Sequence, residues 1–196
     1  MSESMNDEDL DYLSRVNKLY SFIIKKYQDY IEKSETRSIA DMPRLITPES
    51  ERVSDIASFI KSKFPSYLYE NDFYGASIQA LEYLKSNIKE VAMPVQFWLK
   101  PDDVINVGLG EDIDKNVLLC SLLVALGNYS SKVLVVSNDN RKEVFVYYEF
   151  NYRFFLIDIK GKIELFDSNK DLFSYAGIDD NSEAYEFNNL SYFKIV

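Results

Sequence analysis

The single cysteine of the chain, Cys120, lies within residues 108–127, GLGEDIDKNVLLCSLLVALG. A cysteine is a nucleophile for acyl transfer when a base takes its proton, or when a helix N-terminus and nearby cations lower its pKa. The chain contains no histidine, the side chain that most often acts as general base near neutral pH. One cysteine without histidine excludes an internal disulfide and the usual Cys/His zinc sites.

Cys120 is expected to be a packing residue. It follows Asp112 by eight residues, just over two turns, and lies between Leu119 and Leu122 in the middle of a leucine-rich helix. The helix dipole has little effect that far from the N-terminus, and apolar neighbours raise the pKa of a thiol. These surroundings predict a small buried hydrophobic side chain.

The elements before this helix are predicted to be helical. Residues 10–31 have apolar side chains at alternating spacings of three and four, which predicts one long helix with a single apolar face. We expect this helix to dock on its own domain, with self-pairing into a homodimer or partner binding as the alternative. The residues of the stripe are Leu13, Val16, Tyr20, Ile23, Tyr27 and Tyr30.

The domain boundaries follow from composition. Residues 1–34 are predicted to be a helical arm, residues 35–46 a polar linker containing Pro43, and residues 47–196 the domain. Within the domain, Thr47 and Pro48 predict a helix start near residue 48, because Thr can cap and Pro favours the first helical position. Further helices are expected from Asn71 or Asp72, in a short turn ending at Gly108, and over residues 112–126.

The pattern then changes to that of strands. Four β-branched and aromatic runs, separated by turn residues, predict an antiparallel meander. The runs cover residues 132–137, 143–150, 152–158 and 162–167. The end of the chain is expected to add a short helix and an aromatic segment that packs on the domain. Helices followed by a meander give an α+β class.

The leucine helix and its flanks resemble a known family. Residues 110–116, GEDIDKN, are followed by an apolar helix ending at Gly127 and preceded by WLKPDDVINVG. This arrangement is similar to the transglutaminase-like, papain-like superfamily from Thr47 to Asp167. Its signature is Gly-Asp-Cys-x-Asp-x-Ala, then a leucine-rich helix. The resemblance implies a papain-like core, with Gln96 and Trp98 where the fold often supplies groups near the oxyanion.

The resemblance also implies that the catalytic residues of the family are replaced in this chain. The family's nucleophilic cysteine, histidine and aspartate correspond here to Asp112, Glu143 in EVFVYY and Asp158 in FFLID. An aspartate cannot carry out thiol acyl transfer. The chain also contains no histidine that could act as the base in place of Glu143. The resemblance therefore implies a catalytically inactive domain that acts as a protein-binding or structural module.

The family geometry would bring these three carboxylates close together. Like charges at short distance raise each other's pKa or require a cation, so Asp112, Glu143 and Asp158 are candidate ligands of Ca²⁺ or Mg²⁺. The alternative function is then a carboxylate-based or metal-assisted hydrolase. Against a metal site, Asp112 can simply cap the helix and Glu143 can point to solvent. No cofactor is expected.

Charge limits the expected partners. The 196 residues include 32 acidic and 22 basic side chains, a net charge of −10, and 46% are hydrophobic. Without a cluster of lysines and arginines, nucleic acid and anionic membranes are not expected partners, whereas a basic protein is. The acidic N-terminus and the lack of a membrane-spanning apolar run predict a cytoplasmic protein.

Overall fold

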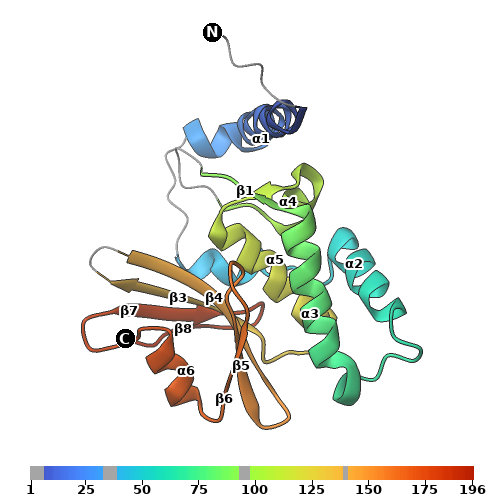
Figure 1. The fold of residues 1–196 in the computed structure, drawn as a ribbon. Coiled ribbons are helices and arrows are strands. Elements are labelled where there is room, and N and C mark those ends of the chain that lie inside the picture. Colours follow the sequence, from blue (N-terminus) through green and yellow to red (C-terminus); the bar gives the residue numbers. More distant parts are fainter. Residues whose placement is uncertain (1–6, 33–38, 93–97, 139–140) are drawn as a thin grey trace.

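The computed structural model describes residues 7–32, 39–92, 98–138 and 141–196 (Figure 1). Helices occupy the first part of the chain and strands the second. The helical elements are α1 (Asp7–Glu32), the 3₁₀ helix η1 (Ile39–Leu45), α2 (Glu51–Ser62), α3 (Tyr69–Asn87), α4 (Pro101–Val107), α5 (Asp112–Ala125) and α6 (Asn169–Tyr175). The strands are β1 (Lys89–Glu90), β2 (Leu109–Gly110), β3 (Lys132–Asn138), β4 (Arg141–Phe150), β5 (Arg153–Ile157), β6 (Ile163–Phe166), β7 (Glu183–Phe187) and β8 (Tyr192–Lys194).

The predicted α+β class is confirmed. Six strands form an antiparallel sheet in the order β6-β5-β4-β3-β7-β8, and β1 and β2 form a separate parallel pair. The four predicted strands are present, but β7 and β8 were not predicted. Their segments, EAYEF and YFK, are short, and neither has the run of β-branched residues that marks the central strands.

The main core lies between α5 and one face of the sheet. From Ile113 to Val124 every residue of α5 is buried, and the helix contacts α2, α3 and α4 as well as β3 and β4. On the opposite face α6 covers a second cluster that includes Phe145, Tyr147 and Leu172. A helix buried all round reads as a continuous apolar run, which is why residues 112–126 were correctly predicted.

Aromatic side chains join α3 to the sheet. Tyr148 on β4 is fully buried, and its ring stacks on Phe155 with centroids 5.0 Å apart. Its hydroxyl lies 3.0 Å from the hydroxyl of Ser77 on α3, so the buried polar atom has a hydrogen-bond partner. Phe73 meets the same ring edge to face at 5.1 Å.

Helix α1 docks on its own domain, against α4 and β2. Leu19 and Ile23 are buried, and Lys26 Nζ lies 2.6 Å from Asp103 Oδ1 on α4. The predicted stripe is displaced in part, because the buried face is centred on Leu19, whereas Leu13 is 44% exposed. Tyr27 and Tyr30 have side chains outside the described part of the structure.

Several boundaries differ from the prediction, among them the start of α2 and the extent of the linker. Helix α2 begins at Glu51 with Ser50 as its cap, three residues later than expected, because Thr47 and Pro48 form a turn closed by a hydrogen bond from Ser50 N to Thr47 O. Within the predicted linker, η1 buries Met42 and Leu45, so this part of the segment packs on the domain. Among the described helices, none combines the length and apolar character needed to cross a bilayer.

Candidate functional site

The parallel pair of β1 and β2 places an acidic residue beside the start of α5. Glu90 on β1 is paired with Gly110 on β2, two residues before Asp112. A side chain at Gly110 would meet Asp114 Cβ at 3.2 Å, which favours glycine at this close approach of β2 and α5. The strand pairing, which no local sequence pattern predicts, thus brings Glu90 to the N-terminus of α5.

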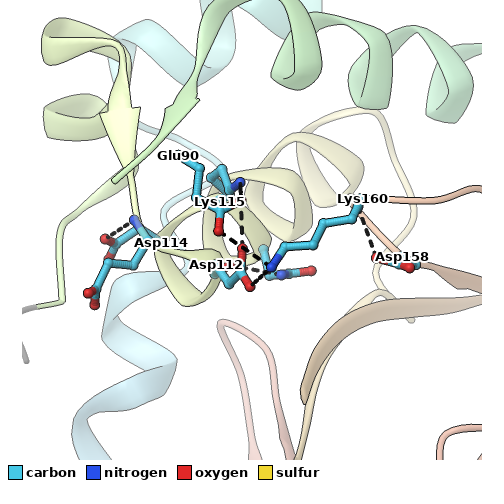
Figure 2. Close-up of polar contacts among 8 residues, drawn as sticks. Glu90, Asp112, Asp114, Lys115, Asp158 and Lys160 are labelled. Atoms are coloured by element: carbon cyan, nitrogen blue, oxygen red, sulfur yellow. Dashed lines mark hydrogen bonds and ion pairs between the residues drawn. The ribbon is translucent and has the colours of Figure 1, made fainter. Parts of the chain in front are cut away.

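Two carboxylates and two lysines form a closed ring of four ion pairs at this end of α5 (Figure 2). Lys160 Nζ lies 2.5 Å from Asp112 Oδ2 and 3.5 Å from Glu90 Oε1. Lys115 Nζ lies 3.2 Å from Glu90 Oε2 and 3.5 Å from Asp112 Oδ1. The charges alternate around the ring and sum to zero. We call these four residues the ion ring.

Asp158 positions Lys160. Its Oδ1 accepts a hydrogen bond of 2.9 Å from the backbone N–H of Lys160, and its carbonyl accepts one from Gly161. A side-chain acceptor two residues before the bonded N–H is typical of an Asx turn. Lys85 on α3 donates to the carbonyl of Gly161 at 2.7 Å and fixes the turn from the other side. Figure 2 shows Lys160 extending from this turn to Asp112.

Glu143 does not join Asp112 and Asp158, which corrects the prediction of three converging carboxylates. Strand residues alternate between faces, and Val144 and Val146 on β4 pack in the core with α5. Glu143 lies opposite Val136 and on the same face as Phe145, and Val136 and Phe145 belong to the cluster under α6. The position at this end of β4 that faces α5 is therefore Val144.

The structure does not bring Asp112, Glu143 and Asp158 together as a set of metal ligands. In the described part of the chain, no group of three or more Asp, Glu, Cys or His side chains could hold a metal ion. Asp112 instead contacts two ammonium groups, which repel a cation, and Asp158 is used in the turn. The reason is the strand register, which turns Glu143 to the other face of the sheet.

Asp114 has a structural role. It is 1% exposed, and its two oxygens accept hydrogen bonds from Leu99 N at 2.8 Å and Glu111 N at 3.1 Å. The first bond ties the segment before α4 to α5, and the second satisfies a free N–H at the start of α5. Trp98, beside Leu99, is partly buried against the main core. Gln96 lies outside the described residues.

Cys120 is fully buried, and burial raises the pKa of its thiol. A thiol held in its protonated form is a poor nucleophile, and it lies in the third turn of α5, away from the ion ring. The interpretation of Cys120 as a packing residue agrees with this environment.

The ion ring has little capacity for acid–base chemistry. The hydrogen bond to Asp112, together with the charges of Asp112 and Glu90, raises the pKa of Lys160, so its ammonium holds its proton more tightly. A general base needs the opposite, a group that is deprotonated near neutral pH. The structure thus places a proton-retaining cation, rather than a base, next to Asp112.

Sequence reasoning missed Glu90 and Lys160. Glu90 follows α3 without any motif, and only the pairing of β1 with β2 brings it to the site. Lys160 had a usable signal, because the KGK turn begins two residues after Asp158 and a turn beside a predicted site residue must place its own side chains nearby.

Comparison with solved structures supports the predicted fold. A structure from Parabacteroides distasonis, described as a proposed protease, matches with a TM-score of 0.50 and 17% identity over 80% of this chain and 30% of that chain. LapG of Legionella pneumophila matches at 0.44 and 15% identity over 76% of this chain and 88% of that chain. Its calcium-bound form matches at 0.43 and 13% identity, with the same coverage. No protein-family model and no curated protein matches the chain.

The class of protein is therefore defined at the level of fold. The chain is an α+β protein with the papain-like, transglutaminase-like arrangement of helices followed by an antiparallel sheet. It spans less than a third of the Parabacteroides protein. At 17% identity the likeness concerns the fold and not the reaction.

Proposed function

We propose that this chain is a catalytically inactive transglutaminase-like domain that binds another protein. The observation that carries the proposal is the ion ring. Lys160 donates to one carboxylate oxygen of Asp112, the residue that the family resemblance assigns to the nucleophile position, and Lys115 lies within ion-pair distance of the other. A nucleophile must be free to approach a substrate carbonyl, and a general base must lie within hydrogen-bond reach of it.

Two further features support inactivity. Val144, the β4 side chain that faces α5, is apolar, so it cannot take a proton from a nucleophile. Asp158, at the position of the orienting carboxylate, holds the backbone N–H of Lys160. Each part of the catalytic arrangement thus has a structural use in this chain.

The proposal of a binding function rests on the fold and the charge. A papain-like fold that has lost its reaction retains surfaces that can hold an extended peptide. With a net charge of −10, the chain would attract a basic partner faster than a neutral one.

The test is a panel of peptide, amide and ester substrates with the full chain, comparing the natural sequence with Asp112→Ala. We expect no turnover above the uncatalysed rate for either protein. Turnover by the natural chain that is lost in Asp112→Ala would overturn inactivity and revive the carboxylate-based hydrolase. An Asp112→Cys, Val144→His double variant is the positive comparison, because it restores a thiol and an imidazole on the α5 side of the sheet.

A further inference from the structure

A hollow of about 450 Å³ lies at the other end of α5 from the ion ring. Because α5 has 14 residues, the two regions are separated by about 20 Å along the helix. Three segments line the hollow, namely the start of α3, the loop after α5 and the β4–β5 turn. We call it the tyrosine hollow. It is defined by Tyr69, Glu70, Tyr129, Glu149 and Tyr152, with Gly127, Ser130, Phe150 and Asn151 completing its wall.

Two tyrosines of the hollow have side chains that are mostly exposed to solvent. Tyr129 is 70% exposed and Tyr152 is 93% exposed. Tyr152 was included in the predicted strand over residues 152–158, and the structure corrects this by placing it in the turn before β5. Exposed tyrosine rings are common anchors of binding surfaces, because they offer a large apolar contact area with only two side-chain torsions to fix.

The backbone under Tyr152 is unusual. Asn151 and Tyr152 form the two-residue turn between Phe150 and Arg153, with φ angles of 51° and 61°. Such turns strongly favour glycine at the second position, where Tyr152 stands, because a Cβ is unfavourable at positive φ. The exposed Tyr152 ring makes little packing contact that would offset the unfavourable backbone conformation. This is the pattern expected of a functional side chain.

The loop that carries Tyr129 is anchored by its neighbours. Asn128 is fully buried, and its Nδ2 donates to the hydroxyl of Tyr69 and to the carbonyl of Glu149, both at 2.9 Å. Its Oδ1 accepts from the backbone N–H of Ser130 at 3.1 Å. The three segments of the hollow are thus tied together by one side chain, so its shape exists before a ligand arrives.

The charge of the hollow is negative. Glu70 and Glu149 are exposed, and among the described residues neither carboxylate has a lysine or arginine within ion-pair distance. Neither lysine nor arginine lines the hollow. After burial, which is the larger cause, both carboxylates raise the pKa of Tyr69 and therefore lie within electrostatic range of its hydroxyl. Tyrosine rings and free carboxylates together match a guanidinium or ammonium group.

We propose that the tyrosine hollow binds an arginine or lysine side chain of a basic segment in a partner protein. This deepens the proposed protein-binding function and rests on it. The cation would lie against the ring faces while its N–H groups meet the carboxylates. Because the hollow is already formed in this chain, little free energy is needed to order the site on binding.

The experiment is an NMR titration of the ¹⁵N-labelled full chain with an acetylated, amidated Gly-Arg-Gly-Arg-Gly peptide. Matched peptides with lysine or glutamate in place of arginine are the comparison arms. We expect the largest shifts at the amides of Ser130, Glu149 and Tyr152, with arginine and lysine binding and glutamate giving no shift. Tyr152→Gly should weaken binding by about two- to fivefold, and the double variant Glu70→Gln, Glu149→Gln by about fivefold or more.

The same set of variants includes a control for correct folding. Glycine suits the left-handed turn, so Tyr152→Gly should melt at or above the temperature of the natural chain, and its loss of binding cannot come from unfolding. Matched variants outside the hollow, Tyr175→Ala on α6 and Asp180→Asn, remove an exposed tyrosine and an exposed charge and should leave binding unchanged.

Shifts spread over the acidic surface, or equal binding by all variants, would overturn the hollow as a site and leave only attraction to the net charge. This failure is distinguishable from failure of the proposed function. Turnover in the substrate panel would refute inactivity while the hollow still bound the peptide, whereas a silent panel with no binding would refute the hollow alone.

Discussion

Lys160 donates a hydrogen bond from its ammonium to Asp112, while Asp158 accepts one from its backbone N–H. In a papain-like active site, the nucleophile and an orienting carboxylate act on the two sides of an imidazole. The family resemblance assigns Asp112 and Asp158 to these two positions, and a lysine from the turn after β5 lies between them. Lys160 thus links the two aspartates through its ammonium, whose pKa is raised, and through its backbone N–H.

This arrangement predicts the behaviour of a thiol placed at residue 112. In Asp112→Cys, the sulfur would lie at the N-terminus of α5 beside Lys115 and Lys160, and both the helix dipole and the ammonium groups favour a thiolate. We expect its pKa to lie below about 8.5, the ordinary value for cysteine. The measurement is the pH dependence of the rate of alkylation by iodoacetamide.

The control is the same variant with Lys160→Gln, which removes the nearer cation and should move the thiol pKa back up. The buried Cys120 is replaced by alanine in both proteins so that only one thiol reacts. If residue 112 alkylated with a pKa at or above the ordinary value, the ammonium groups would not lie where the structure puts them.

Cys120 itself should be inert in the folded protein. Burial raises the pKa of its thiol, so it remains protonated, and the reagent cannot reach it. Ellman's reagent should give no colour with the native chain and one equivalent after addition of guanidinium chloride. Rapid reaction under native conditions would mean that α5 opens readily or that Cys120 is accessible.

Periodicity was enough to predict the α-helices before the sheet, the strands β3 to β6 and the packing role of Cys120, because each depends on a local pattern of apolar residues. The arrangement of Glu143 was not predictable in this way. Matching the family pattern put Glu143 at the histidine position, but a shift of one residue along a strand changes the face, and the pairing of β4 with β3 places Val144 toward α5.

The ion ring could not be predicted from local sequence patterns, because its residues are brought together by tertiary structure. Glu90 and Lys160 are 70 residues apart in the chain, and they meet at Asp112 only because β1 pairs with β2 and because Lys85 and Asp158 fix the turn. Contacts of this range follow from tertiary structure. They leave no local pattern beyond the presence of charged residues next to predicted elements.

The two lysines of the ion ring should contribute unequally to stability. The side chain of Lys115 is 9% exposed and that of Lys160 is 55% exposed. Exposed ion pairs contribute about 0–1 kcal/mol, so Lys160→Met should change the free energy of unfolding by no more than that. Lys115→Met leaves two carboxylates facing a site without its buried cation and should cost about 1–3 kcal/mol. Urea denaturation of both variants measures the difference.

Each lysine variant serves as the control for the other, since both lose one ammonium and keep an unbranched stem. Equal costs for the two variants would contradict the burial of Lys115. A larger cost for Lys160→Met would mean that the turn after Asp158 depends on the ion pair rather than on its backbone hydrogen bonds.

Alkaline pH should unfold the protein through its buried tyrosines. Burial raises the pKa of Tyr67 to about 12, and burial also raises the pKa values of Tyr147 and Tyr148. Because the folded values lie above the unfolded value of about 10, the stability is fully present below pH 10 and is lost as the pH rises through the folded values. Absorbance of tyrosinate and far-ultraviolet circular dichroism should show these side chains ionising together with loss of structure.

The comparison for this titration is the protein held in guanidinium chloride, where all 15 tyrosines should ionise near pH 10. A native chain that ionised every tyrosine near pH 10 while keeping its circular dichroism would contradict the burial of Tyr148 and Tyr147.

Helix α1 gives the last prediction, which separates docking from self-pairing. Leu19 is fully buried against the domain, so Leu19→Ala should lower the free energy of unfolding by about 2–5 kcal/mol in the monomer. Leu13, on the same helix but 44% exposed, is the matched control, and Leu13→Ala should have little effect. Light scattering of the full chain should give a monomer mass, and so should a version that begins at Ile39 and retains η1. If Leu13→Ala instead converted a dimer to a monomer and lowered stability in a concentration-dependent way, the exposed face of α1 would be the dimer interface, and docking through Leu19 would coexist with self-pairing.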